Sequence, residues 1–137
     1  MEAKSITVIM TSVIEDEGTT VTRYDGLLRV AGGVTRISYT EDDNGAQTST
    51  LLTIGRGEVT LVRRGAVNFS TVYRKGYTHR SLYSLGGLSF DAEVATEQLT
   101  VLPTTLPAFD CVYCLTLGGE ARRFALSLRL EEREGTA

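Results

Sequence analysis

The sequence has no tryptophan, one histidine, two prolines and two cysteines in 137 residues. Two cysteines are too few for a disulfide framework, and one histidine cannot complete a structural zinc site. No apolar run approaches the ~18 residues of a membrane-spanning helix, and residues 1–5 lack the basic and apolar regions of a signal peptide. We therefore expect a cytoplasmic protein with reduced cysteines, without a metal, a cofactor or a membrane partner.

The sequence also has no large excess of basic or acidic residues. The 14 basic and 17 acidic side chains leave a net charge of −3, which gives no strong field to attract nucleic acid. The apolar share of 42% and the charged share of 23% are ordinary for a globular protein. Because the chain has no low-complexity segment or linker, we predict a single domain over residues 1–137.

Helical periodicity is absent, and short runs alternate between apolar and polar residues instead. Glycine interrupts these runs about every ten residues, a spacing typical of all-β sandwiches and barrels. The expected strands are 4–15, 19–31, 34–42, 46–55, 58–63, 66–73, 77–84, 88–102, 108–117 and 120–131.

Two turns fit the two-residue hairpin type, in which glycine and asparagine tolerate positive φ angles. They are Asn44-Gly45 and Gly118-Gly119. Each sets apolar residues opposite one another, which supports the pairing. The expected pairs are Tyr39 with Thr50, Ile37 with Leu52, Thr35 with Ile54, Tyr113 with Phe124, Cys111 with Leu126 and Phe109 with Leu128.

Two other turns have three residues with glycine last, as in a type I turn closed by a bulge. They are Arg63-Arg64-Gly65 and Arg74-Lys75-Gly76. The expected pairs are Leu61 with Val67, Val59 with Phe69, Tyr73 with Tyr77, Thr71 with His79, Phe69 with Ser81 and Val67 with Tyr83.

Nine or ten sequential strands joined by tight turns form a meander. A meander of this length splits into two sheets or curls shut, and closure removes the exposed edges that invite aggregation. The absence of crossover helices excludes parallel sheets. We predict an all-β, closed antiparallel meander barrel of about 8–10 strands, with an open sandwich as the alternative.

The stretch from Val59 to Thr96 resembles the YwiB-like small bacterial proteins, a domain of unknown function with a calycin-like, lipocalin-like barrel. The residues that carry the resemblance are Arg64-Gly65, Tyr73 three before Gly76, Tyr83-Ser84, Gly87 and Thr96. Ser84 stands where the pattern has threonine, and Leu85-Gly86 replaces a pair that contains proline. The resemblance implies a barrel whose interior can hold a cavity. It implies no activity, because the family's own function is not established.

One face of the central hairpin is rich in aromatic residues, whereas its opposite face is polar. We expect the aromatic face to point inward, where it either fills the core or lines a ligand cavity. Its members are Phe69, Thr71, Tyr73, Tyr77, His79, Ser81 and Tyr83. Our leading hypothesis is a non-enzymatic barrel that binds a small, partly apolar molecule, contacted by Phe69, Tyr73, Tyr77, His79 and Tyr83.

No catalytic residue is predicted. His79 as a general base would need a nucleophile or an orienting carboxylate, and the sequence identifies neither. Cys111 and Cys114 resemble a redox or zinc motif, but residues three apart on a strand point to opposite faces. We interpret Cys111 as a small core residue.

The alternative hypothesis is a protein- or RNA-interaction module that uses the outer surface. Its basic residues would be Arg63, Arg64, Arg74 and Lys75, at hairpin tips on opposite ends of one strand. Such a separation does not form one compact patch, and a nucleic-acid groove needs basic residues in register. Acidic runs at residues 15–17 and 41–43 are interpreted as solubilising residues beside turns. The sequence does not decide whether the protein forms a homo-oligomer.

Overall fold

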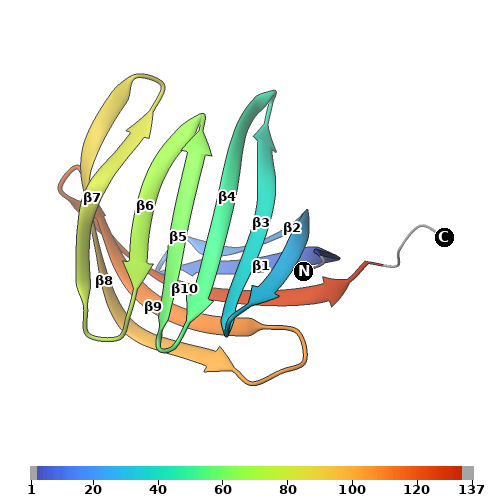
Figure 1. Ribbon diagram of the computed structural model, residues 1–137. Coiled ribbons are helices and arrows are strands. Elements are labelled where there is room, and N and C mark those ends of the chain that lie inside the picture. The colour runs from blue at the N-terminus through green and yellow to red at the C-terminus, as the bar shows by residue number, and fades with distance from the viewer. Residues whose placement is uncertain (1–2, 134–137) are drawn as a thin grey trace.

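The chain forms ten β-strands in a computed structural model that describes residues 3–133 (Figure 1). The strands are β1 (Lys4–Ile14), β2 (Gly18–Ala31), β3 (Val34–Asp43), β4 (Ala46–Gly55), β5 (Glu58–Gly65), β6 (Val67–Tyr73), β7 (Thr78–Leu85), β8 (Leu88–Leu102), β9 (Ala108–Leu117) and β10 (Glu120–Glu132). Each pairs antiparallel with its neighbours in sequence, and β1 pairs with β10 to close a barrel. The predicted fold class is confirmed, and every strand lies within two residues of its predicted bounds.

Residues 3–133 contain no helix, and therefore none that is long and apolar enough to cross a membrane. Because successive side chains alternate between the two faces of each strand, every second side chain points into the barrel. The barrel has two ends. We call the end that carries the β1–β2, β3–β4, β5–β6, β7–β8 and β9–β10 turns the open end, and the opposite one the closed end.

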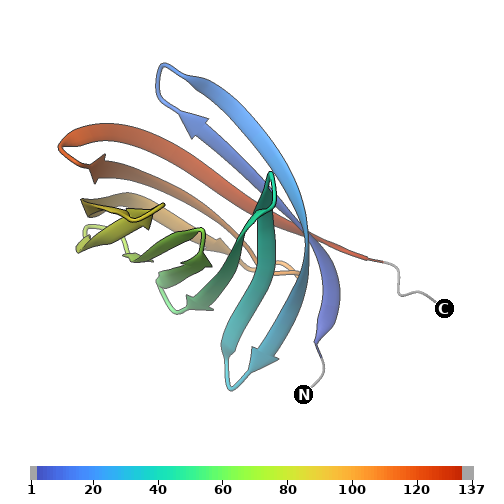
Figure 2. The ribbon, with the colours of Figure 1, turned by 90° about the horizontal axis from the view of Figure 1, so that it is seen from above.

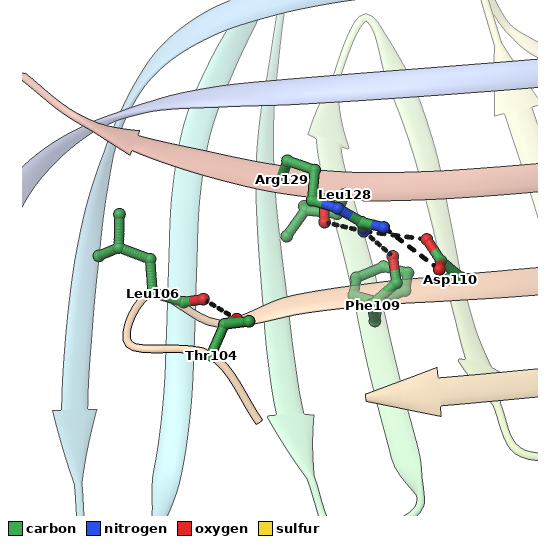
Figure 3. Close-up of polar contacts among 6 residues, drawn as sticks. All are labelled: Thr104, Leu106, Phe109, Asp110, Leu128 and Arg129. Carbon is green, nitrogen blue, oxygen red and sulfur yellow. Dashed lines mark hydrogen bonds and ion pairs between the residues drawn. The ribbon is translucent and has the colours of Figure 1, made fainter. Parts of the chain in front are cut away.

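The interior near the closed end is packed with apolar side chains. Its fully buried members are Ile6, Val8, Ile37, Leu52, Val59, Phe109 and Leu128. The loop of residues 103–107 between β8 and β9 lies at this end, and its Leu106 packs against the core. The Thr104 hydroxyl donates to the Leu106 carbonyl and holds the loop together (Figure 3). Apolar burial of this kind is worth about 25 cal/mol per Å², so this half of the barrel supplies much of the stability.

On the outer surface an arginine joins β9 to β10 beside two of these core residues (Figure 3). Arg129 makes a two-point ion pair with Asp110, with Nη1 2.9 Å from Oδ1 and Nη2 3.2 Å from Oδ2. Nη1 also donates to the backbone carbonyls of Leu128 and Phe109. The guanidinium holds the pKa of Asp110 below its ordinary value. The pair is half-exposed, so we expect it to contribute at most about 1 kcal/mol.

The two-residue turns behave as predicted. The structure pairs Tyr39 with Thr50 across β3 and β4, and Tyr113 with Phe124 across β9 and β10. All six expected pairs of these two hairpins are confirmed. Asn44, with a φ of +53°, adopts the left-handed conformation that a two-residue turn of this type requires.

The β5–β6 register differs from the prediction, because Gly65 does not close the turn. It stays in β5, opposite Thr48 of β4, and the backbone N–H of Ala66 then donates to the Gln47 carbonyl at 2.9 Å. The Asn68 side chain donates to the Gly65 carbonyl at 3.0 Å and accepts from its N–H at 3.3 Å. The turn is therefore centred on Ala66.

As a result, Leu61 lies opposite Thr71 instead of Val67, and Val59 lies opposite Tyr73 instead of Phe69. The shift is an even number of residues. An even shift keeps every side chain on its predicted face of the sheet, so the inward and outward sets of β5 and β6 remain as expected.

The β6–β7 register also differs. Within residues 3–133 the ladder consists of two pairs, Val67 with Leu85 and Asn68 with Ser84. The turn before β7 is closed by the Tyr77 backbone N–H, which donates to the Arg74 carbonyl at 2.9 Å. We call the sparsely bonded boundary between these strands the β6–β7 seam.

A second weak boundary separates β2 from β3. Their ladder runs from Ala31 with Val34 to Gly26 with Tyr39, and beyond it the two strands diverge toward the open end (Figure 2). A Cβ atom on Gly26 would lie 2.7 Å from the Ser38 carbonyl oxygen, so only glycine fits at the point of divergence. We call the gap beyond this point the β2–β3 wedge.

A polar cavity at the open end of the barrel

A cavity of about 260 Å³ lies inside the barrel toward the open end. We call it the mouth cavity. Its lining includes Tyr24, Tyr39, Glu41, Arg63, Tyr73 and Tyr113. Apolar contributions come from Met10, Leu61 and Leu126. The interior is thus divided into a packed apolar half and a half that contains a polar cavity.

An ion pair between β3 and β5 forms the polar centre of the cavity. Arg63 Nη2 lies 3.0 Å from Glu41 Oε2, and Arg63 Nε donates to the same oxygen at 3.1 Å. The Thr50 hydroxyl donates to Oε2 at 2.9 Å, and the Tyr24 hydroxyl reaches Oε1 at 3.3 Å. The Arg63 and Glu41 side chains are only 23% and 25% exposed. Charges that are buried to this extent persist because they are paired and hydrogen-bonded.

Aromatic rings form the walls. Tyr24 and Tyr39 stack with ring centroids 4.6 Å apart and planes 18° apart. Tyr73 packs against Tyr113 at 4.9 Å, and Tyr113 stacks on Phe124 at 5.1 Å. Rings with polar tips can contact the flat face of a ligand and still donate or accept a hydrogen bond.

Burial keeps the phenols of this cavity neutral. Loss of hydration raises the pKa of Tyr113 to about 12 and raises that of Tyr73 well above its ordinary value. Burial, with the neighbouring Glu41 charge as a smaller cause, also raises the pKa of Tyr24 and of Tyr39. These hydroxyl groups are therefore hydrogen-bond donors throughout the physiological range of pH.

These shifts predict a loss of stability at alkaline pH. The Cys111 thiol, whose pKa burial raises from 9.0 to about 12, behaves as Tyr113 does. Above pH 9 to 10 the unfolded chain releases these protons while the folded chain retains them, so stability present below pH 9 is lost as the pH rises toward 12. Urea unfolding at pH 8 and pH 11 should differ by at least about 4 kcal/mol.

The control for this prediction is Tyr113→Phe, which removes one titrating group. Its unfolding free energy should fall less steeply than the wild-type value between pH 10 and pH 12. Identical slopes would contradict the assignment of Tyr113 to this loss.

The β2–β3 wedge adjoins the mouth cavity. A surface hollow of about 770 Å³ lies in the wedge. It shares Thr22, Tyr24 and Tyr39 with the lining of the mouth cavity. The two hollows therefore border the same side chains, among them the stacked rings of Tyr24 and Tyr39.

The five residues predicted as ligand contacts from the central hairpin lie in four different places. Tyr73 is buried and lines the mouth cavity. Phe69 and Tyr83 pack on each other across the β6–β7 seam, with ring centroids 5.4 Å apart. His79 is half-buried on β7. Tyr77 lies at the turn before β7, where it is 36% exposed and its ring is covered by the Arg74 guanidinium at 4.6 Å.

Four buried polar atoms near the β6–β7 seam have no hydrogen-bond partner among residues 3–133. They are Thr71 Oγ1, His79 Nδ1, Ser81 Oγ and Thr96 Oγ1. Within the same range no carboxylate is hydrogen-bonded to His79, so the geometry that a histidine base requires is not present there. The described residues also contain no group of three or more potential metal ligands.

Thr71 gives a stability test of this region. Its side chain is fully buried, and its hydroxyl is one of the four unpartnered groups. Thr71→Val should raise the free energy of unfolding by about 1 kcal/mol, because it removes a desolvated hydroxyl at nearly constant volume. Urea unfolding measures the change, and a destabilisation would show that the hydroxyl has a partner.

Thr50→Val is the matched control. Thr50 is equally buried, but its hydroxyl donates to Glu41. Thr50→Val should lower the free energy of unfolding by about 1–2 kcal/mol.

The basic residues of the alternative hypothesis are not equivalent. Arg63 does not lie at a hairpin tip as predicted but faces inward from β5 and pairs with Glu41. Arg74 pairs with Glu58 at 2.9 Å on the outer surface. Arg64 and Lys75 are exposed. Two of the four positive charges are therefore already used within the fold.

Both cysteines are free thiols. Cys111 is buried and faces the core, and Cys114 is half-buried. The high pKa of the Cys111 thiol makes it a poor nucleophile, which agrees with its interpretation as a core residue.

Sequence reasoning missed Glu41 as a site residue and placed Arg63 on the outer surface, because charged residues near turns were assigned to solvent. The signal was the alternation itself. Glu41 lies two positions after the inward Tyr39, and Arg63 lies two positions after the inward Leu61, so both belong to the inward set.

Comparison with known proteins identifies relatives of the fold. The domain of unknown function DUF1934 matches residues 6–128. The crystal structure of ywiB protein from Bacillus subtilis superposes with a TM-score of 0.79 at 21% sequence identity, covering 93% of this chain and 92% of that chain. No curated protein sequence matches this chain. The predicted resemblance to YwiB-like proteins is confirmed.

Proposed function

The chain belongs to the DUF1934 family of domains of unknown function, and we propose that it binds a small, partly apolar molecule in the mouth cavity. The observation that carries the proposal is a space of about 260 Å³ within a barrel whose other half is packed. The inward side chains leave this hollow unfilled, and concave hollows with a few placed polar groups are where small molecules bind.

The residues that line the mouth cavity favour a specific ligand over bulk water. Three apolar side chains and several rings surround one ion pair, and a few placed polar groups within an apolar wall are typical of ligand sites. Among the five residues predicted from sequence as ligand contacts, Tyr73 is the one that lines this cavity. The proposal therefore keeps the interior ligand and moves its contacts toward β2, β3 and β5.

Native mass spectrometry of the protein purified from its own host tests the proposal. We expect a reproducible added mass that is retained under gentle ionisation and lost on denaturation. Thr22→Trp should abolish the added mass, because Thr22 lines the cavity and the indole would occupy the space.

The matched control is Val21→Trp, at the adjacent position on the opposite face of β2. Val21 is 58% exposed, so its replacement leaves the cavity unchanged. A bare wild-type chain, or a guest retained equally by both variants, would refute binding in the mouth cavity.

A further inference from the structure

The ion pair of the mouth cavity leaves part of its hydrogen-bonding capacity unused. Glu41 Oε2 accepts hydrogen bonds from Arg63 and Thr50, whereas Oε1 accepts only a long one, of 3.3 Å, from the Tyr24 hydroxyl. A carboxylate oxygen can accept two hydrogen bonds. Oε1 therefore has room for a stronger donor.

Arg63 has the complementary capacity. Its contacts with Glu41 use Nε and Nη2, and Nη1 takes part in none of the contacts within residues 3–133. A guanidinium carries five N–H donors in a fixed plane. The pair thus has one acceptor and one donor unused, and both residues line the mouth cavity.

The charges of the Arg63–Glu41 ion pair determine which net charge of a ligand the site favours. Arg63 and Glu41 neutralise each other, and both are about three-quarters buried. A charged ligand would bring an uncompensated charge into a partly buried site, at a desolvation cost that no free counter-charge offsets. A neutral ligand with a donor beside an acceptor avoids this cost.

The walls and the volume limit its shape. Tyr24 and Tyr39 present a stacked pair, and Tyr73 and Tyr113 present a second aromatic surface. At about 260 Å³ the cavity is near the lower end of ligand pockets, which span about 300–1,000 Å³. A planar molecule of one or two rings fits these limits.

From these observations we propose that the ligand is a neutral, planar ring compound with an amide or lactam edge. Its N–H donates to Glu41 Oε1, and its carbonyl accepts from Arg63 Nη1. This inference rests on the proposed function, since it specifies the chemistry of the same cavity.

Three pyridines that share a ring and differ in charge test the inference. Nicotinamide is a neutral amide, nicotinate is an anion, and 3-(aminomethyl)pyridine is a cation. Isothermal titration with the wild-type protein should show nicotinamide binding at least tenfold more tightly than either ion. Nicotinate or the amine binding as tightly as nicotinamide would overturn the inference.

Glu41→Gln makes the test sharper, because it leaves the Arg63 charge without a counter-charge. In this variant the affinity for nicotinate should rise at least tenfold relative to the affinity for nicotinamide. Glu58→Gln is the matched control. Glu58 pairs with Arg74 on the outer surface, so the wild-type order of affinities should persist. An unchanged order in Glu41→Gln would also overturn the inference.

The remaining outcomes separate this inference from the proposed function. If none of the three pyridines binds but the host-purified protein retains a guest, the inference fails and the proposed function stands. If none binds and no guest is retained, both fail.

Discussion

Replacing Gly65 with alanine is expected to lower the free energy of unfolding by at least about 3 kcal/mol. Gly65 has a φ of +135°, a conformation that other residues rarely adopt. An added Cβ atom would lie 2.3 Å from the Gln47 carbonyl oxygen. That oxygen cannot move aside freely, because it accepts the hydrogen bond from the Ala66 backbone N–H. Urea unfolding at neutral pH measures the loss.

Gly87→Ala is the control for this prediction. Gly87 also has a positive φ, of +84°, but no atom lies within 4 Å of the position that its Cβ would take. Its replacement should cost about 1 kcal/mol, from backbone conformation alone. Equal losses at the two sites would contradict the close approach of β5 to β4 at Gly65.

Replacing Arg63 with leucine is expected to cost about 2 kcal/mol, because it leaves the Glu41 carboxylate poorly hydrated and without its counter-charge. Adding Glu41→Gln to this variant should recover part of the loss, since the isolated charge is then removed. A double-mutant cycle over the two positions, measured by urea unfolding, should give a coupling energy above about 1 kcal/mol.

The exposed pair of Arg80 and Glu93 gives the comparison. Its side chains are 82% and 40% exposed, and the nitrogen and oxygen lie 3.4 Å apart. Arg80→Leu should change stability by less than about 0.5 kcal/mol. A coupling between Arg63 and Glu41 that is equally small would show that their side chains face bulk water.

The sequence predicted the barrel and most strand bounds because alternation and turn chemistry are local signals. Asn44-Gly45 and Gly118-Gly119 leave no choice of register, since a two-residue turn fixes which residues face each other. Gly65 was predicted to end a turn but instead meets β4. That contact involves Gln47, 18 residues away, and no local pattern reports it.

The candidate site was predicted less well than the fold. The inward direction of Tyr73 followed from alternation. The position at which the packed core ends and the mouth cavity begins depends instead on how neighbouring strands diverge. Gly26 permits the β2–β3 wedge through its contact with Ser38, and this contact joins two strands. Glu41 and Arg63 meet across β4, so their pairing follows from the barrel and not from either run of sequence.

A high-resolution crystal structure of the protein purified from its own host tests the central claim most directly. We expect density for a planar guest in the mouth cavity, within hydrogen-bond distance of Glu41 Oε1 and Arg63 Nη1. The contradicting result is a cavity filled by neighbouring side chains, with Glu41 and Arg63 turned to solvent.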